Sequence, residues 1–133
     1  MATVRGIAQV QAALRRVEKQ VETASRLSVV QGASLLEAAA KSNFEGSHKR
    51  GEPHVGGNKP NVVTGHLRRS IRQGLAVRLG FASWAVRVGP TAIYSRRVEL
   101  DYGYAYFMPA VRSTAPKLAA IARANWTAAI IRR

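Results

Sequence analysis

The chain has no cysteine, which excludes disulfide bonds, thiolate metal ligands and cysteine nucleophiles. It also lacks any apolar run approaching the ~20 residues that a membrane-spanning helix needs. The N-terminal stretch MATVRGIAQV lacks the basic-then-apolar order of a secretory signal. We therefore expect a soluble protein made in a cytoplasm, with no membrane partner.

Acidic residues are scarce. Seven Asp and Glu stand against 21 Lys and Arg, and downstream of Glu52 the only acids are Glu99 and Asp101. General acid–base catalysis needs paired carboxylates or a histidine oriented by an acid. We therefore expect no catalytic residues, no cofactor and no metal. An RNase-like enzyme using His66 and Glu99 is the least favoured alternative.

The net charge of +14 is the outlying property of the composition. A field of this sign attracts polyanions and repels copies of the same chain. It therefore favours contact with nucleic acid or with an acidic protein surface. The alternative, dispersed and solvated arginines without a partner, stays open because the charges are not clustered.

At 133 residues, of which 47% are hydrophobic, the chain has the size and apolar content of one folded domain, 1–133. Its N-terminal third, from Val4 to about Phe44, has no proline and predicts a long helix. The stripe of that helix has alternating spacings of 3 and 4, and consists of Ile7, Val10, Leu14, Val17, Val21 and Ala24.

The stripe then loses its register, because Ser28 and Gln31 fall where apolar residues should continue it, and we expect a bend or break near Gly32. A helix of 40 residues would extend about 60 Å, longer than a globule of this size is wide. Part of it should therefore project or pack on another chain. The alternative is a hairpin of two helices that turns near Gly32.

Residues 45–61 have four Gly, two Pro and almost no apolar side chain, which predicts a flexible basic loop. His48 and His54 lie in it without acids or cysteines at ligand spacing, so we interpret them as solvated loop residues.

The stretch NVVTGHLRRSI, 61–71, lacks the glycines and the Gly-Lys-Ser/Thr step of a phosphate loop. We expect Thr64 to cap a short helix that Gly65 allows the chain to enter sharply. Leu67 and Ile71, four residues apart, should bury one face of it. The arginines should then point outward: Arg68, Arg69 and Arg72.

Two segments then alternate with period two, GLAVRLG and SWAVRVG, and predict an antiparallel β-hairpin. We expect its apolar face to be buried: Leu75, Val77, Leu79, Trp84, Val86 and Val88. Arg78 and Arg87 should lie on the opposite, basic face.

Residues 92–103 suit a short helix, with a strand as the alternative. On a strand, Glu99 and Asp101 would share a face and could bind a cation, but an ion pair with Arg96, Arg97 or a neighbouring subunit is the favoured role.

A cap signal at Ser113 or Thr114 and a following proline predict the start of an amphipathic C-terminal helix. Its expected stripe is Leu118, Ile121, Ala122, Asn125 or Trp126, Ala129 and Ile130. The predicted fold class is α+β, with this helix packed on the hairpin-based sheet.

The order of these features resembles the neck or tail-completion proteins of long-tailed bacteriophages. The matching residues lie between about 4 and 131, and each motif is short, so the order carries the resemblance. They are Thr64, Gly65, Leu67, Ser70 and Ile71; Tyr94, Val98, Glu99 and Gly103; and Pro109 and Ala110. In that family the glutamate is commonly followed closely by Gly-Thr, whereas here LDYGYAYF follows it.

The resemblance implies a structural virion protein, made in the host cytoplasm and placed at the head–tail junction. Subunits of the same chain would form a ring, of six or twelve copies, that bridges a portal-side connector or stopper and the tail tube around the DNA channel. It implies no enzyme, and leaves open a tail terminator or a head-side connector. The residues expected at ring contacts are Arg68, Arg69, Arg72, Arg78, Arg87, Lys49, Arg50, Lys59, Arg97 and Glu99. The alternative is a stand-alone basic protein that binds nucleic acid.

Overall fold

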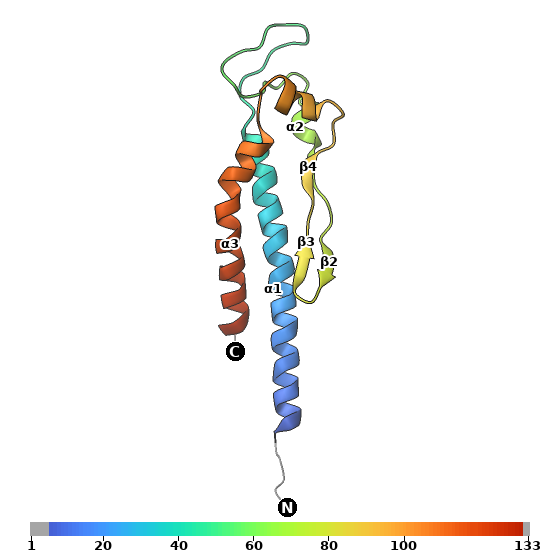
Figure 1. Ribbon diagram of the computed structural model, residues 1–133, viewed down its shortest axis with the longest axis vertical. Coiled ribbons are helices and arrows are strands. Elements are labelled where there is room, and N and C mark those ends of the chain that lie inside the picture. The colour runs from blue at the N-terminus through green and yellow to red at the C-terminus, as the bar shows by residue number, and fades with distance from the viewer. Residues whose placement is uncertain (1–5, 132–133) are drawn as a thin grey trace, which may run out of the picture.

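The computed structural model describes residues 6–131 and shows an elongated α+β fold arranged along one long helix (Figure 1). This confirms the predicted class. The helices are α1 (Ile7–Ser42), α2 (His66–Ser70) and α3 (Phe107–Ile131), with one π-helical turn, η1 (Arg97–Asp101). The strands are β1 (Ile71–Gln73), β2 (Val77–Gly80), β3 (Ser83–Ala85) and β4 (Val88–Pro90).

Helix α1 is one unbroken helix of 36 residues. The expected break near Gly32 and the alternative helical hairpin are both wrong. Gly32 is buried against α3 instead, and a Cβ built on it would lie 2.6 Å from Cδ2 of Leu118. Glycine at this position therefore permits a close helix–helix approach.

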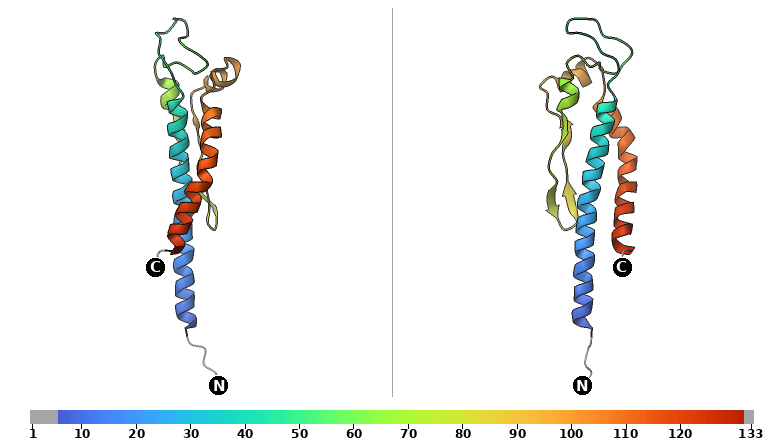
Figure 2. Two further views of the ribbon diagram at one scale, coloured as in Figure 1. Left: turned by 90° about the vertical axis from the view of Figure 1, so that its left-hand side faces the viewer. Right: turned by 180° about the vertical axis from the view of Figure 1, so that it is seen from behind.

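Helix α3 runs antiparallel to α1 and lies beside it in every view (Figure 2). The amide of Asn125 donates to the hydroxyl of Ser28 at 3.0 Å and to Oε1 of Gln31 at 2.8 Å. These are the polar residues that interrupt the apolar stripe of α1. The interruption is therefore a polar pairing across the seam between α1 and α3.

The N-terminus of α3 is capped by a distant carboxylate. Oε2 of Glu99 accepts hydrogen bonds from the backbone N–H groups of Tyr106 and Phe107, both at 3.0 Å. Oε1 accepts the N–H of Met108 at 2.9 Å, and Pro109 has no N–H that needs a partner. The prediction that the helix starts at Ser113 or Thr114 is wrong, because this cap starts it at Phe107 and places Pro116 inside it.

Residues 95–101 are helical and end in η1, so the strand alternative for this segment is wrong. The carboxylate of Glu99 has an intramolecular role in the α3 cap, and its expected role at a ring contact stays a prediction. In residues 6–131 it makes no ion pair with Arg96 or Arg97.

The four short strands form one long, interrupted antiparallel ribbon. β1 pairs with β4 and β2 pairs with β3, and the register shifts between the two pairs and again near the tip. The N–H of Gly74 donates to the carbonyl of Arg87 at 2.8 Å, which continues the pairing between the two ladders. The predicted hairpin is therefore confirmed as a ribbon that lies along α1 (Figure 1).

The core gathers at one end of the molecule, where α1, α2, β1 and α3 meet. Leu67 and Ile71 are buried there, as predicted, at 9% and 0% exposure. Tyr106 is fully enclosed too, and burial, with the charge of Glu99 nearby, raises the pKa of its hydroxyl to about 12. The remaining buried members of this cluster are Ala40, Ala92 and Ala110.

The turn that leads into α2 differs from the expectation in one respect. Gly65, with φ of 77°, occupies the cap position, a left-handed conformation that glycine adopts without strain. The hydroxyl of Thr64 accepts the N–H of His66 at 3.3 Å, but Thr64 itself is not the cap residue. The sharp turn is confirmed and the identity of its cap is corrected.

Candidate functional site

The ribbon is attached to α1 through one carboxylate, Glu22. Its side chain accepts hydrogen bonds from Nε of Arg78, from the backbone N–H of Ala82 at 2.6 Å and from Nε1 of Trp84 at 3.0 Å. The guanidinium of Arg26, one turn further along α1, lies 5.7 Å from the centre of the Trp84 ring. The tip of the ribbon is thereby fixed against the middle of α1.

This attachment decides which face of the ribbon points outward. Arg78 and Trp84 lie opposite each other in the ladder, and both face α1. Side chains alternate along a strand, so the neighbours of Arg78 point away from α1. Alternation within each strand is confirmed, but the predicted pairing of the two faces is wrong: Trp84 shares the inward face with Arg78, and β2 turns its apolar side chains to solvent.

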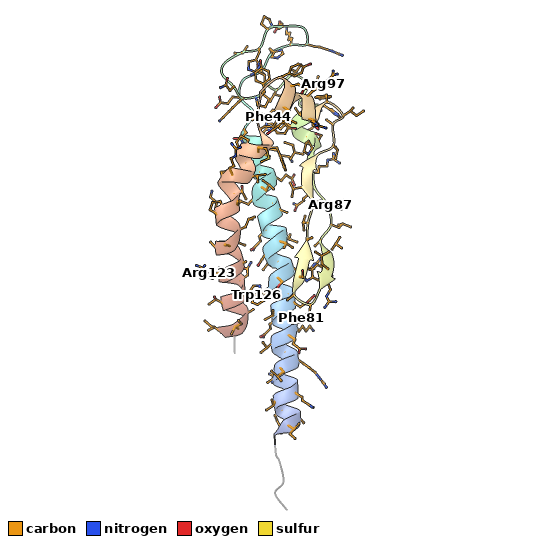
Figure 3. The ribbon with its side chains drawn as sticks, viewed as in Figure 1. Phe44, Phe81, Arg87, Arg97, Arg123 and Trp126 are labelled. Atoms are coloured by element: carbon orange, nitrogen blue, oxygen red, sulfur yellow. The ribbon has the colours of Figure 1, made fainter. Side chains whose placement is uncertain are left out.

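The outward face carries large apolar side chains with no partner in the described part of the chain. Exposed fractions are 89% for Leu75, 56% for Val77, 68% for Leu79 and 61% for Phe81. The first three were expected in the core. We call these four residues the ribbon face; Figure 3 shows Phe81 at the free end of the ribbon.

Replacing Glu22 with Gln should release the ribbon tip, because an amide cannot accept from three donors as a carboxylate does. We expect faster hydrogen exchange at the backbone N–H groups of residues 80–85. Glu18→Gln, one turn earlier on the exposed part of α1, removes the same charge and should leave their exchange unchanged. Equal acceleration in both variants would contradict the attachment.

The same attachment predicts a pH response. The hydrogen bonds from Arg78 and Ala82 lower the pKa of the folded Glu22 carboxyl below its usual value of 4.5. A lowered pKa stabilises the fold above 4.5, and that contribution is lost as the pH falls through the folded-state value. The protection factors of residues 80–85, which correct for the intrinsic pH dependence of amide exchange, should therefore fall in the wild type below pH 4.5, whereas those of Glu22→Gln should stay low throughout.

A second uncovered apolar surface lies at the start of α1. The helix continues past the ribbon tip and past the end of α3 (Figure 1), and residues 7–19 are all exposed. Its stripe, which we call the overhang stripe, consists of Ile7, Val10, Leu14 and Val17, with exposed fractions of 53%, 59%, 57% and 41%. The expectation that the helix is longer than its globule is confirmed.

The overhang stripe continues a seam that the fold already uses. The next residues on the same helical face, Val21 and Ala24, are buried to 8% and 5% exposure. Ala24 lines a cavity with Asn125 and Ala129 of α3. One face of α1 is thus covered where α3 lies against it and bare where α3 has ended.

The basic residues expected at contacts do not gather into one patch. Arg87, between β3 and β4, and Arg97, on η1, lie apart along the molecule (Figure 3). All of them are exposed: Arg68, Arg69, Arg72, Arg78, Arg87, Arg97, Lys49, Arg50 and Lys59. Two of these also form ion pairs within the chain, Arg78 with Glu22 and Lys59 with Glu45.

The loop 45–61 is held by its own hydrogen bonds at the core end of the molecule. The side-chain amide of Asn61 forms hydrogen bonds with the backbone of Val55 and of Glu45. Ser47 and Val62 form an isolated β-bridge. The ring of His54 stacks on that of Tyr104 with centroids 4.1 Å apart. His54 is therefore packed rather than free in solvent, which corrects that expectation.

A cavity of ≈ 280 Å³ lies under this loop, and His48, His54, His66 and three tyrosines contribute to its walls. Its histidines have no acid beside them in the lining. Among residues 6–131, no three or more His, Asp or Glu side chains are gathered as a metal site requires. Within the same range, no helix has the length and apolarity to cross a membrane.

Reasoning from the sequence missed two features: the role of Glu22 in holding the ribbon, and the outward orientation of the ribbon face. Comparison of the chain with family models, with curated proteins and with solved structures gives no match in any of the three. The geometry of these surfaces therefore carries the functional argument, together with the resemblance in motif order.

Proposed function

We propose that this protein is a structural component of a bacteriophage particle that forms a ring at the head–tail junction. It would bridge the portal-side connector and the tail tube around the DNA channel. The observation that carries the proposal is the ribbon, which turns the apolar side chains of β2 to solvent and turns Arg78 and Trp84 toward its own helix. Exposed apolar surface of this extent is typical of proteins that assemble.

Three further features support a role in assembly. The overhang stripe is a second apolar surface without an intramolecular partner. The order of motifs from about 4 to 131 resembles that of neck and tail-completion proteins. The exposed arginines Arg68, Arg69 and Arg72, on and beside α2, offer contacts for acidic faces of adjoining rings or for DNA that passes through the channel.

Mass spectrometry and electron microscopy of purified particles test the proposal. We expect the chain in the particle at six or twelve copies, with density at the neck that accommodates the elongated fold. A protein that is absent from the particles and strictly monomeric in solution would contradict it. A deletion of the gene should give separate heads and tails.

The charge of +14 favours one competing function, a stand-alone protein that binds nucleic acid. That function predicts tight binding of duplex DNA with a steep loss of affinity as salt rises, because binding releases counterions. A failure to bind duplex DNA at ~0.15 M salt would exclude it.

A further inference from the structure

We infer that the overhang stripe of one copy packs on the ribbon face of a second copy of this chain. The inference deepens the proposed ring function and rests on it, because it names the surfaces through which neighbouring subunits meet. The occupant of each bare surface is therefore the other bare surface, presented by the next subunit.

The two surfaces match in kind and in length. Each presents four large apolar side chains that are 41% to 89% exposed. At ~1.5 Å per residue, the overhang from Ile7 to Val17 extends about 15 Å. At ~3.3 Å per residue, the ribbon from Leu75 to Phe81 extends about 20 Å. The overhang, a helix of about three turns, can therefore lie along most of the ribbon face.

The structure also indicates why the overhang needs a partner. An isolated helical segment shorter than ~12–15 residues is marginal in water, and its stability comes from packing of an apolar face. The overhang stripe continues the face that α3 covers at Val21 and Ala24. The ribbon of a neighbouring copy would cover the part of this α1 face that α3 does not reach.

A contact of overhang on ribbon is heterologous, because the two surfaces belong to different parts of the chain. When the rotation between neighbours closes, such a contact gives a ring that leaves neither surface bare in any subunit. Pairing of two overhangs, in contrast, is isologous and gives a dimer in which both ribbon faces stay exposed. The heterologous contact is the arrangement that covers both surfaces at once.

The absence of native cysteine allows a direct test. Two single variants, Leu14→Cys and Leu79→Cys, are mixed at high protein concentration in 0.5 M salt (roughly a 4–5 Å Debye length), which screens repulsion between basic copies. A short bismaleimide reagent should then yield a crosslinked heterodimer, identified by mass spectrometry. Because each variant has one thiol, the crosslink reports only contact between different molecules.

Ile93→Cys is the matched control, since Ile93 is 101% exposed and lies on neither surface. Its mixture with Leu14→Cys should give much less crosslink than the Leu14→Cys and Leu79→Cys mixture. Crosslinking of Leu14→Cys with itself at equal yield would overturn the inference in favour of paired overhangs. A yield from Leu14→Cys and Leu79→Cys no higher than that of the control would overturn it as well.

A second measurement uses the exposed positions themselves. Leu14→Ser and Leu79→Ser should fold normally, since both side chains face solvent in the single chain, and each should weaken self-association about 10-fold or more by analytical ultracentrifugation. Unchanged association in both variants would overturn the inference. The particle experiment remains separate: a protein found in the neck without this crosslink refutes the contact alone, and a crosslinked ring absent from particles refutes the neck function alone.

Discussion

Replacing Glu99 with Ala should lower the free energy of unfolding by about 2–3 kcal/mol, one of the two largest effects that we expect from a single substitution. The carboxylate accepts the backbone N–H groups of Tyr106, Phe107 and Met108. Loss of a cap side chain typically costs about 0.5–2 kcal/mol, and hydrogen bonds to charged groups about 1.5–3 kcal/mol. Thermal denaturation followed by circular dichroism measures the change, as a fall in Tm on the order of 10 °C.

The control for this prediction is Asp101→Ala. Asp101 lies two residues after Glu99 and is exposed, so its replacement removes the same charge without removing the cap. It should change stability by less than about 0.5 kcal/mol. Glu99→Gln should give an intermediate loss, because one carbonyl oxygen of the amide still accepts from the helix terminus. Equal Tm values for Glu99→Ala and Asp101→Ala would refute the capping role.

The cap also shows where reasoning from sequence reaches its limit. Ser113, Thr114 and Pro116 form a convincing local start signal, and capping rules look for a partner within about three residues of the helix start. The group that starts α3 is Glu99, seven to nine residues before the amides that it holds. The chain returns to it through the turn after η1, and no local pattern encodes that return.

The ribbon shows a different limit. Period two correctly predicts the alternation within each strand, since alternation is a property of any strand. It groups Trp84 with the wrong residues of the neighbouring strand, because Trp84 lies opposite Arg78 and not beside Val77 and Leu79. It does not predict which face meets the protein, because a two-stranded ribbon has two free faces and tertiary contacts choose between them. Here Glu22 binds Arg78, Trp84 and Ala82, and this choice exposes the apolar side.

The polar residues in the apolar stripe of α1 indicate a contact with α3 and not the break that we expected. Ser28 and Gln31 interrupt the apolar stripe and predicted a break in the helix, although the interruption has a partner in Asn125. Buried polar groups are normally paired. Polar residues in the stripes of two predicted helices therefore indicate a register between those helices as readily as a break in one of them.

The proposed assembly would explain why so much apolar surface survives in a chain of this charge. The ribbon face and the overhang stripe are bare in the single chain, whereas its arginines are spread over several elements (Figure 3). Like charge keeps free copies apart at low salt and allows association once counterions or acidic neighbours screen it. Self-association should therefore strengthen with salt, opposite in sign to DNA binding, which weakens.

Ile71→Ala should produce the other large effect, a loss of about 3–4 kcal/mol in the free energy of unfolding. Ile71 is fully enclosed at 0% exposure, where α2 ends and β1 begins, and it belongs to the cluster around Ala40 and Tyr106. Truncation of a buried Ile to Ala typically costs about 2–5 kcal/mol, since it removes burial and leaves a cavity. Urea denaturation should show a lower midpoint with an unchanged slope.

The chain offers a matched control for this substitution in Ile93, which is 101% exposed on the loop after β4. Ile93→Ala deletes the same atoms, but at this position they contact only solvent. Its free energy of unfolding should therefore stay within about 0.5 kcal/mol of the wild-type value. Ile71→Val, which removes one methylene, should cost only about 0.5–1.5 kcal/mol. If Ile71→Ala and Ile93→Ala had the same midpoint, Ile71 would not lie in the core, and the junction of α2 with the ribbon would have to be placed differently.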